Sequence, residues 1–325
     1  MRDSGTEIAL PLPDGRLLAA TEQAGALELR LDQQPFERFA LTREGERAVL
    51  ASGRLPDSAF PFWAASYCLF ARQPPCREIV WSFPEAPKAA AALGLVQTEA
   101  GSWRTTRERF WQLPVPWLPG ADRRARFDGD PQPPKPEGLL YRRFDNRLGQ
   151  WISFRTIDAT RDLERFNGWQ NNRRVRHFWQ EGGTLTEHRD YLGRIAADPH
   201  IFSVIGCFDD EPFGYFEVYW AKDDRIAPFY PVGEHDRGLH MLVGEERHRG
   251  PHKVASWLAA LAHYLFLDDP RTETLVAEPR SDNEKMIEYM RLQGFHKEKE
   301  FDFPHKRAAL MMLSRRRFFS ESDLS

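Results

Sequence analysis

The sequence is poor in the features that mark secreted and membrane-spanning proteins. Its 325 residues contain three cysteines, Cys68, Cys76 and Cys207, whose spacing fits no metal-binding pattern. So sparse and odd a set suits a reducing compartment better than a disulfide scaffold. No run approaches the roughly eighteen apolar residues that a membrane-spanning helix needs, and the N-terminal segment lacks the apolar core of a signal peptide. We therefore expect a soluble, cytoplasmic protein without membrane association.

The sequence also lacks an excess of positive or of negative charge. Lysine and arginine number 45 and aspartate and glutamate 48, so that the formal net charge is −3. The basic residues are scattered among acidic ones instead of forming runs, which argues against a nucleic-acid partner. What the chain does have is length, enough for two domains and at least one sizeable core.

Three regions of the chain differ in pattern. Residues 1–118 contain segments of alternating apolar residues between turn signals, which predict a β-rich accessory domain with a structural or oligomerising role. Residues 119–138 are rich in proline and charge and poor in apolar residues, which predicts a stiff linker. From residue 139 to residue 325, strand-like segments, among them 201–208 and 296–303, are mixed with helix-like segments, and this predicts an α/β domain. Within it, residues 169–180 are expected to form a polar-aromatic turn.

Residues 237–253 predict a strand, a tight turn and the start of a helix. A short apolar run of strand length precedes a polar turn bracketed by Gly244 and Gly250, and helical periodicity begins at Val254. A loop that ends at a helix N-terminus presents unpaired backbone N–H groups and a positive dipole end, which together suit a pyrophosphate. The turn alone fits an ordinary surface turn equally well. The basic residues that would complete a pyrophosphate site are Arg247, Arg249 and Lys253.

The segments that follow resemble a known fold. A short strand at 274–277 precedes Asp282 and Asn283, and the predicted helix over 282–292 closes in Gly294-Phe295. Together with the basic turn, these features resemble the acyl-CoA core of the GNAT acetyltransferase superfamily. The resemblance implies a mixed, splayed central sheet flanked by helices, to which the N-terminal β-rich domain would be an addition.

Two positions depart from the usual GNAT pattern. The pyrophosphate turn of the family, Arg/Gln-x-x-Gly-x-Gly/Ala, is matched by Arg247 and Gly250, but His252 stands at the last position. Many members carry a tyrosine general acid four residues before the later glycine, where this chain has Met290. Tyr289 is one residue away and is expected to point elsewhere on the helix.

Longer motifs narrow the resemblance to the siderophore-biosynthesis acyltransferases, and among these to the aerobactin-type hydroxylysine acetyltransferases. The resemblance covers the whole chain and is strongest from Leu139 to Phe319. Because five motifs occur in order, they are more specific together than any one alone. These motifs are Trp169-x-Asn171-x-x-Arg174-Val175-x-x-Phe178-Trp179, Phe216-Glu217-Val218-Tyr219-Trp220, Asp236-Arg237-Gly238-Leu239-His240, Glu278-Pro279-Arg280-x-Asp282-Asn283 and Glu300-Phe301-Asp302-Phe303-Pro304-His305-Lys306.

This resemblance implies an enzyme that uses acetyl-CoA and no metal, and that acetylates the hydroxylated side-chain nitrogen of N(6)-hydroxylysine to give a hydroxamate. It implies a lysine N-hydroxylase and a siderophore synthetase as functional partners, in iron acquisition. Hydroxycadaverine or hydroxyornithine as acceptor and succinyl-CoA as donor stay open. So do a non-catalytic acyl-CoA-binding role beside a siderophore synthetase, and the formation of a homo-oligomer.

The resemblance also assigns site residues. His240 is the candidate base, because imidazole titrates near working pH, with a buried core histidine as the structural alternative. Asp282 is the candidate orienting or second proton-accepting group, or else the N-cap of its helix. The expected acyl-CoA-binding residues are Leu242, Val243, Gly244, Arg247, Arg249, Gly250, His252, Lys253 and Asn283. The expected acceptor-binding residues are Asn171, Arg174, Trp179, Glu217 and Tyr219, with Glu217 and Arg174 assigned to the α-amino and α-carboxylate groups.

Overall fold

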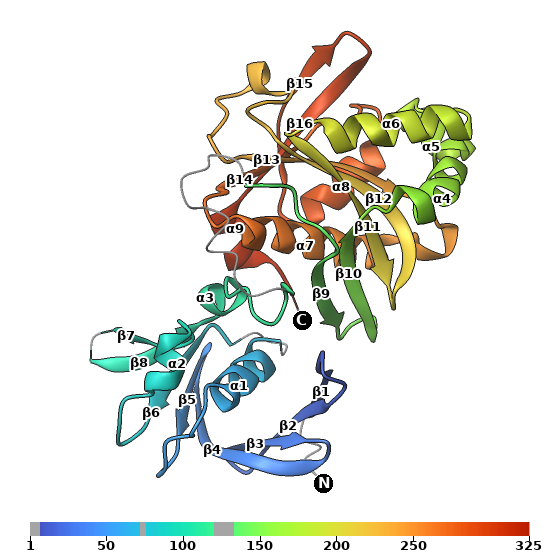
Figure 1. Ribbon diagram of the computed structural model, residues 1–325. Helices are drawn as coiled ribbons and strands as arrows, with labels where there is room; N and C mark the ends of the chain where they lie inside the picture. The colour runs from blue at the N-terminus through green and yellow to red at the C-terminus, as the bar shows by residue number, and fades with distance from the viewer. Residues whose placement is uncertain (1–6, 72–75, 100, 120–132, 325) are drawn as a thin grey trace. The chain divides into compact units, whose positions relative to one another are not determined.

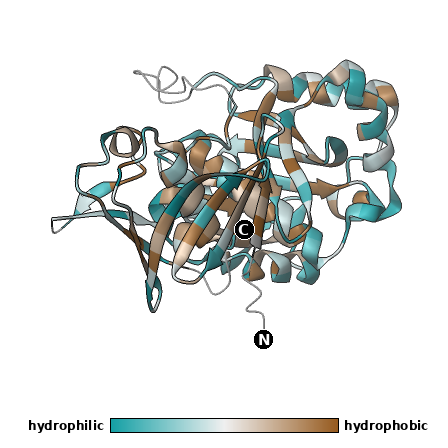
Figure 2. Cartoon of the chain, turned by 90° about the horizontal axis from the view of Figure 1, so that it is seen from below, coloured by the Kyte–Doolittle hydropathy of each residue, from teal (hydrophilic) through white to brown (hydrophobic). Residues whose placement is uncertain are grey.

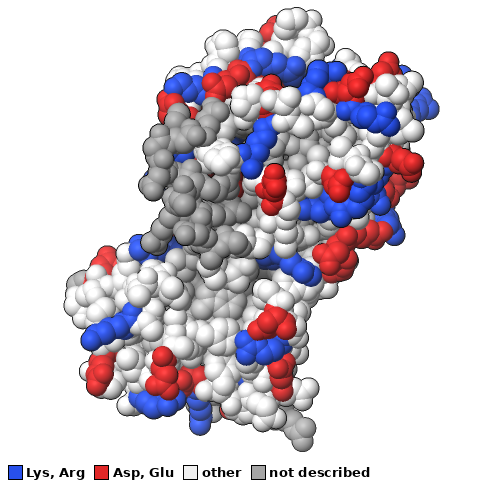
Figure 3. Space-filling model, in the orientation of Figure 1, with Lys and Arg blue, Asp and Glu red and all other residues white. Residues whose placement is uncertain are grey.

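The computed structural model of the protein describes residues 7–71, 76–99, 101–119 and 133–324, so most of the linker predicted at 119–138 lies outside the described residues. The chain divides into two compact units. The residues up to Pro116, with the last residues of the chain, form one unit, and Trp117–Ser322 form the other. Each unit is built on one eight-stranded sheet (Figure 1). On the face seen in Figure 3, acidic and basic side chains are interspersed on both units.

The sheet of the N-terminal unit has the order β1-β2-β3-β4-β5-β6-β8-β7. Its neighbours are antiparallel except β5 and β6, which pair in parallel over five residue pairs, from Arg47↔Glu78 to Ala51↔Ser82. Helix α1 is apolar on all sides and almost wholly buried, as expected of a helix enclosed by other elements. The elements are β1 (Glu7–Pro11), β2 (Leu17–Gln23), β3 (Ala26–Leu31), β4 (Gln34–Glu44), β5 (Arg47–Ala51), α1 (Phe60–Phe70), β6 (Glu78–Ser82), α2 (Lys88–Ala92), β7 (Gln97–Glu99), β8 (Ser102–Thr106) and α3 (Arg107–Trp111).

The sheet of the C-terminal unit has the order β15-β16-β14-β13-β12-β11-β10-β9. The strands predicted at 201–208, 274–277 and 296–303 are confirmed at their predicted bounds. The elements are β9 (Leu139–Asp145), β10 (Gln150–Thr156), α4 (Ala159–Asn171), α5 (Arg173–Trp179), α6 (Leu185–Ala197), β11 (Ile201–Phe208), β12 (Glu211–Trp220), η2 (Ala227–Phe229), β13 (Arg237–Val243), η3 (Glu246–His248), α7 (Pro251–Asp268), β14 (Thr274–Ala277), α8 (Glu284–Leu292), β15 (His296–Phe303), β16 (Lys306–Ser314) and α9 (Arg315–Glu321).

Three predictions about helices in this unit are wrong. The predicted turn at 169–180 contains helix α5, which begins because the side chain of Asn172 accepts a hydrogen bond from the Arg174 backbone N–H. Helix α7 begins at Pro251, because proline at the first position of a helix lacks only a donor that would be unpaired there anyway. Helix α8 begins at Glu284, and its N-cap is Asn283 instead of Asp282.

Helices cover the C-terminal sheet on two faces, and neighbouring residues of β12 show which helix lies on which face. Tyr215 packs against Phe166 of α4 with ring centroids 4.7 Å apart, while Phe216 packs against Trp257 of α7 at 5.3 Å. Successive strand residues point to opposite faces, so α4 and α7 lie on opposite sides of the sheet. Helices α4 and α6 alternate polar and apolar residues in the manner of surface helices (Figure 2). No helix of the described ranges is long and apolar enough to cross a membrane.

The parallel pair of the C-terminal sheet separates after two residue pairs. β13 and β14 pair at Arg237↔Leu275 and Gly238↔Val276, while β13 continues to Val243 beside β12. Among the strands that the structure describes, none pairs with the β14-facing edge of β13 beyond Gly238. Gly238 itself gives room to Tyr219, because a Cβ there would overlap the tyrosine ring.

Candidate active site

A cleft of about 1010 Å³ lies where β13 and β14 separate. Its walls come from the end of α5, from β12 and β13, from the start of α7, from the end of β14 and from α8. The hairpin between β15 and β16 closes a further side. Elements distant in sequence thus meet at one place, the point at which the sheet is split.

At the centre of the cleft, the imidazole of His240 lies between two carboxylates. Its Nδ1 is 2.8 Å from Oε2 of Glu217, and its Nε2 is 2.7 Å from Oε1 of Glu278. Glu217 is the cross-strand neighbour of His240, and Glu278 directly follows β14. The histidine side chain is 20% exposed, whereas those of Glu217 and Glu278 are 3% and 0% exposed. We call these three residues the carboxylate–imidazole row.

Tyrosine hydroxyls satisfy the outer oxygens of the row. Tyr191 and Tyr215 donate to Oε1 of Glu217 at 2.5 and 2.8 Å, and Tyr219 donates to Oε2 of Glu278 at 2.7 Å. Buried carboxylates are costly unless hydrogen bonds surround them. These three tyrosines therefore hold the two carboxylates in place and fix the orientation of the imidazole.

Two opposing effects decide the charges in the row. Burial disfavours the charged forms, and the attraction between the imidazolium and the two carboxylates favours them. Burial alone would lower the pKa of His240, but the negative charge of Glu278 and hydrogen bonds to Glu217 and Glu278 raise the pKa of the ring to about 10. Burial likewise opposes ionisation of both glutamates, yet contacts with His240 lower the pKa of each carboxyl. At neutral pH the row is thus carboxylate, imidazolium, carboxylate. The expectation that His240 titrates near working pH is wrong, because both ring nitrogens face carboxylates.

Asp282 is not brought to His240. Its carboxylate pairs with Arg280, with Oδ2 2.7 Å from Nη2 and Oδ1 3.0 Å from Nε, and its side chain is 55% exposed. The arginine lines the cleft. Glu278, at the end of the neighbouring strand, takes the place beside the imidazole that sequence reasoning gave to Asp282.

The expected acyl-CoA-binding residues divide into two groups. Leu242, Val243, Arg249, Gly250 and Asn283 line the cleft. At Gly250 the backbone has φ +118°, a conformation that side chains rarely adopt, and the glycine caps α7 without a side-chain hydrogen bond.

The remaining predicted members of that group have other partners. Arg247 forms an ion pair with Glu211, and Lys253 contacts Gln150 and lies 4.2 Å from the ring centroid of Phe208. The backbone N–H of Gly244 donates to Phe213 at 2.9 Å, and a Cβ at Gly244 would overlap the Trp169 indole. The ring of His252 lies beside Gly250.

The expected acceptor-binding residues are largely engaged in holding the cleft together. Asn171 bonds both the N–H and the carbonyl of Gly183, at 3.0 and 2.7 Å. Arg174 lines the cleft, but its Nη2 donates to the Val243 carbonyl at 2.6 Å. Trp179 also lines it and donates to the Met241 carbonyl at 3.3 Å. Glu217 and Tyr219 belong to the row and its support.

Sequence reasoning missed several residues of the cleft. Glu278 stood inside a quoted motif without a role, and Tyr191 carried no local signal. Tyr289 was expected to point elsewhere, but it lines the cleft, while Met290 is fully buried. Lys306 also stood inside a quoted motif without a role, and its Nζ donates to the Glu278 carbonyl at 2.7 Å. These side chains reach the cleft through contacts between segments that are distant in the sequence, and local sequence patterns do not reveal such contacts.

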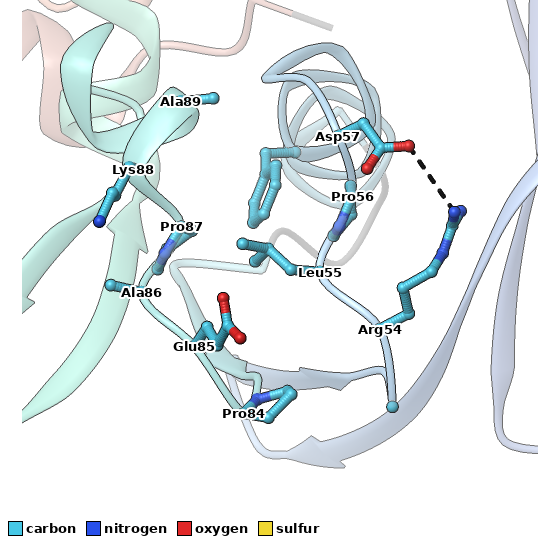
Figure 4. A pocket seen from close by; sticks show the side chains of 12 residues that line it. Arg54, Leu55, Pro56, Asp57, Pro84, Glu85, Ala86, Pro87, Lys88 and Ala89 are labelled. Atoms are coloured by element: carbon cyan, nitrogen blue, oxygen red, sulfur yellow. Dashed lines mark ion pairs between the residues drawn. The ribbon is translucent and has the colours of Figure 1, made fainter.

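A second cavity, of about 760 Å³, belongs to the N-terminal unit (Figure 4). It is lined by the segments that lead from β5 into α1 and from β6 into α2, and Arg54 and Asp57 form an ion pair of 3.7 Å at its side. Its described lining residues include no histidine, cysteine, serine, threonine or tyrosine. The charged residues of its lining are Arg54, Asp57, Glu85 and Lys88.

Comparison with known proteins agrees with this fold and site. Residues 158–303 match the GNAT acetyltransferase domain. The chain is 44% identical over 255 residues to the N(6)-hydroxylysine O-acetyltransferase of Escherichia coli, which covers 75% of this chain and 79% of that protein.

Two further matches cover smaller parts of this chain. The chain is 45% identical over 191 residues to an N(5)-hydroxyornithine:cis-anhydromevalonyl coenzyme A-N(5)-transacylase of Beauveria bassiana, over 58% of this chain and 42% of that protein. An uncharacterized protein of Bacillus halodurans has a structure with a TM-score of 0.55 and 30% identity, over 58% of this chain and 98% of that one. The chain belongs to the GNAT acetyltransferase family and is an acyltransferase.

Proposed function

We propose that the protein transfers the acetyl group of acetyl-CoA to the hydroxylated side-chain nitrogen of N(6)-hydroxylysine, and so forms a hydroxamate. The observation that carries this proposal is the carboxylate–imidazole row at the split of the sheet, in a chain 44% identical to an N(6)-hydroxylysine O-acetyltransferase. A hydroxamate is a group that binds iron, so the proposed role is siderophore biosynthesis and iron acquisition. The reaction would take place in the cytoplasm, between a lysine N-hydroxylase and a siderophore synthetase.

The acyl donor is proposed to lie along the free edge of β13. Arg249 and Gly250 would face its pyrophosphate at the N-terminus of α7, where backbone N–H groups and the helix dipole favour an anion. Backbone N–H groups near Leu242 and Val243 would donate to the thioester carbonyl oxygen, where negative charge develops. Asn283, at the start of α8, lines the same side of the cleft.

The acceptor needs little help to become a nucleophile. An ordinary lysine amine has a pKa of ~10.4 and is mostly protonated at neutral pH, whereas a hydroxylamine is far less basic and keeps its lone pair. In the proposed step, this nitrogen attacks the thioester carbon, the C–S bond breaks and the nitrogen loses its proton. Because both ring nitrogens of the imidazolium already carry protons, a carboxylate oxygen of the row would accept this proton, with the three groups acting as a coupled unit.

Two further residues have proposed parts in the reaction. Tyr289 lines the cleft on α8 and is proposed to return a proton to the departing CoA thiolate. Asp282 is proposed to act at one remove from the reacting atoms, by holding Arg280 against the cleft wall. Residues 1–118 are proposed to be an accessory domain joined by a linker at 119–138 to a catalytic domain at 139–325.

A second acceptor, hydroxyornithine, is favoured by the likeness to a hydroxyornithine transacylase. The test is a panel of lysine, hydroxylysine, hydroxyornithine and hydroxycadaverine with acetyl-CoA and succinyl-CoA, in which release of free CoA is followed. Hydroxylysine with acetyl-CoA should give the highest kcat/KM, and lysine should give none above background. If no acceptor accelerates CoA release, the enzymatic proposal fails, and a non-catalytic acyl-CoA-binding role is what remains.

A further inference from the structure

We propose that Arg225 and Lys306 form the binding site for the acceptor's carboxylate, so that the protein selects a hydroxylated amino acid over a hydroxylated diamine. The inference rests on the proposed function and deepens it, since it concerns the far end of the same substrate. It replaces Arg174, whose guanidinium donates to the Val243 carbonyl at 2.6 Å.

The two cations lie side by side over one aromatic ring. Arg225 comes from the loop between β12 and β13, and Lys306 is the first residue of β16. The guanidinium carbon of Arg225 is 5.1 Å, and Nζ of Lys306 is 5.5 Å, from the centroid of Phe303. Both residues line the cleft, as does His305, whose ring stacks on Phe303 at 5.5 Å. A shared apolar platform thus presents positive charge to the cleft from two separate elements.

The carboxylate that both cations approach is Glu278, and it already has closer partners, while the charge of Asp224 also acts on Lys306. Oε1 of Glu278 is 3.8 Å from Nη2 of Arg225 and 3.7 Å from Nζ of Lys306, but it is only 2.7 Å from Nε2 of His240. The other oxygen, Oε2, accepts from Tyr219 at 2.7 Å. Three positive groups therefore share Glu278, and the two more distant ones, Arg225 and Lys306, remain able to contact an incoming carboxylate.

Hydrogen-bond donors are available as well as charge. In the described parts of the chain, Arg225 donates no hydrogen bond to another residue, and Nζ of Lys306 donates one, to the Glu278 carbonyl at 2.7 Å. Half of the Arg225 side chain is exposed. A guanidinium presents paired N–H groups that match a carboxylate, so the unused donors suit this ligand.

The position of this pair fits the length of the acceptor. Glu278 touches both His240 and the Arg225–Lys306 pair, so a carboxylate held by these cations lies one side chain away from the row. An acceptor anchored there can extend an aliphatic chain toward the imidazolium. Arg249, assigned above to the pyrophosphate, lies near Arg174 instead: burial and then the charge of Arg249 lower the pKa of that arginine. The carboxylate site and the pyrophosphate site are thus made of different cations.

The decisive experiment compares hydroxylysine with N-hydroxycadaverine, which has the same side-chain hydroxylamine but no carboxylate. With saturating acetyl-CoA, the wild-type protein should prefer hydroxylysine. Arg225→Gln should lower kcat/KM for hydroxylysine by roughly 10- to 100-fold, mostly through KM, because a hydrogen-bonded charge contact is lost. The value for hydroxycadaverine should change little, and Arg225→Lys should restore part of the preference. Lys222→Gln, in the same loop and paired with Glu234, is the matched control and should behave as wild type.

The outcomes separate this inference from the proposed function. Equal losses for both acceptors in Arg225→Gln, or a wild-type preference for hydroxycadaverine, would overturn the carboxylate site while leaving the acyltransferase intact. If neither acceptor is turned over, the proposed function fails, and equilibrium titration of both compounds into the protein with CoA then decides the site. Tighter binding of hydroxylysine that Arg225→Gln abolishes would support it, and equal binding by both proteins would overturn it.

Discussion

The two sheets of this protein have the same strand order, yet only one is split. In each, five strands form a meander, a parallel sixth strand follows a helix, and a final hairpin places its second strand beside the sixth. The parallel pair β5–β6 stays joined over five residue pairs, whereas β13–β14 separates after two. The difference teaches that the site arises from the separation of two strands, and that the strand order alone does not create it.

The side chains at the two parallel pairs match this difference. Between β5 and β6, Ala48, Leu50, Ile79 and Trp81 are at most 2% exposed and form a continuous apolar core. At the corresponding place in the C-terminal unit, the charged side chains of the row line a cleft. The C-terminal unit also carries α4 to α6 between its second and third strands, where the N-terminal unit has only a short turn. The same strand order thus carries a closed apolar sheet in the N-terminal unit and the candidate active site in the C-terminal unit.

The largest expected effect comes from His240→Gln, which removes the centre of the row. A group that takes part in proton transfer contributes about 10²–10⁴-fold, so kcat for hydroxylysine acetylation should fall by that factor. The two buried glutamates also lose their cationic partner, which should lower the free energy of unfolding by about 3–5 kcal/mol. Steady-state CoA release and urea unfolding measure the two effects.

A matched change in the N-terminal sheet separates folding from catalysis. Thr105 accepts a buried hydrogen bond from Trp81 at 2.8 Å. Thr105→Val should therefore cost about 1–3 kcal/mol of stability and leave kcat unchanged. Equal losses of kcat in the two variants would mean that His240 serves the fold alone.

The next effect concerns Gly250 and Gly53, each of which lies between the two strands of a parallel pair. Gly250→Val forces a side chain into a backbone with φ +118°, a strain of about 1–3 kcal/mol. The Kd for acetyl-CoA should rise roughly tenfold or more by calorimetric titration. Gly53, which lines the cavity of the N-terminal unit, has open space around a would-be Cβ. Gly53→Val should leave the Kd for acetyl-CoA unchanged. A higher Kd in this variant would mean that the N-terminal unit takes part in binding acetyl-CoA, which would contradict the proposed site.

A smaller effect is expected from alkaline pH on stability. The pKa of His240 is raised to about 10, so its stabilising charge is fully present below the ordinary histidine pKa and is lost as pH rises through about 10. The free energy of unfolding should therefore fall between pH 7 and pH 10. In Glu278→Gln, which removes the main source of the raised pKa, this fall should be shallower. Parallel slopes in urea titrations of the two proteins would contradict the assignment.

The smallest effect is expected from Asp282→Asn. An exposed ion pair contributes about 0–1 kcal/mol, so loss of the Arg280 contact should lower kcat by no more than about fivefold. Arg280→Gln should give a similar value. If Asp282→Asn lowered kcat as much as His240→Gln does, the account would be contradicted, and Asp282 would have to act directly on the reacting atoms.

Local pattern was enough to predict most of the elements. Short segments of strand length between turns located β11, β14 and β15, because these signals lie within the local sequence. The polar stretch that became α5 was missed, since its helix depends on the cap at Asn172 and on packing of Val175. Residues of the pyrophosphate turn were predicted by type, but in the structure Arg249 lines the cleft, while Arg247 forms an ion pair with Glu211 of β12.

The row could not be derived from spacing. Glu217 and His240 lie on β12 and β13, Glu278 directly follows β14, and the strand register brings their side chains together. Motif resemblance selected His240 and paired it with Asp282, four residues beyond the glutamate that actually contacts the ring. The charge state of the imidazole followed from that contact, and it reversed the expectation of a histidine titrating near neutral pH.

The pH dependence of acetyl transfer by the wild-type protein and by His240→Gln tests the central claim most directly. With saturating acetyl-CoA and hydroxylysine, the account predicts that the row keeps one ionisation state across neutral pH, since the pKa of His240 is about 10. Any acidic limb should then belong to the acceptor and persist, at a lower rate, in the variant. A limb near pH 6.5 that is present in the wild-type protein and absent from the variant would contradict the account and would identify His240 as a free imidazole base.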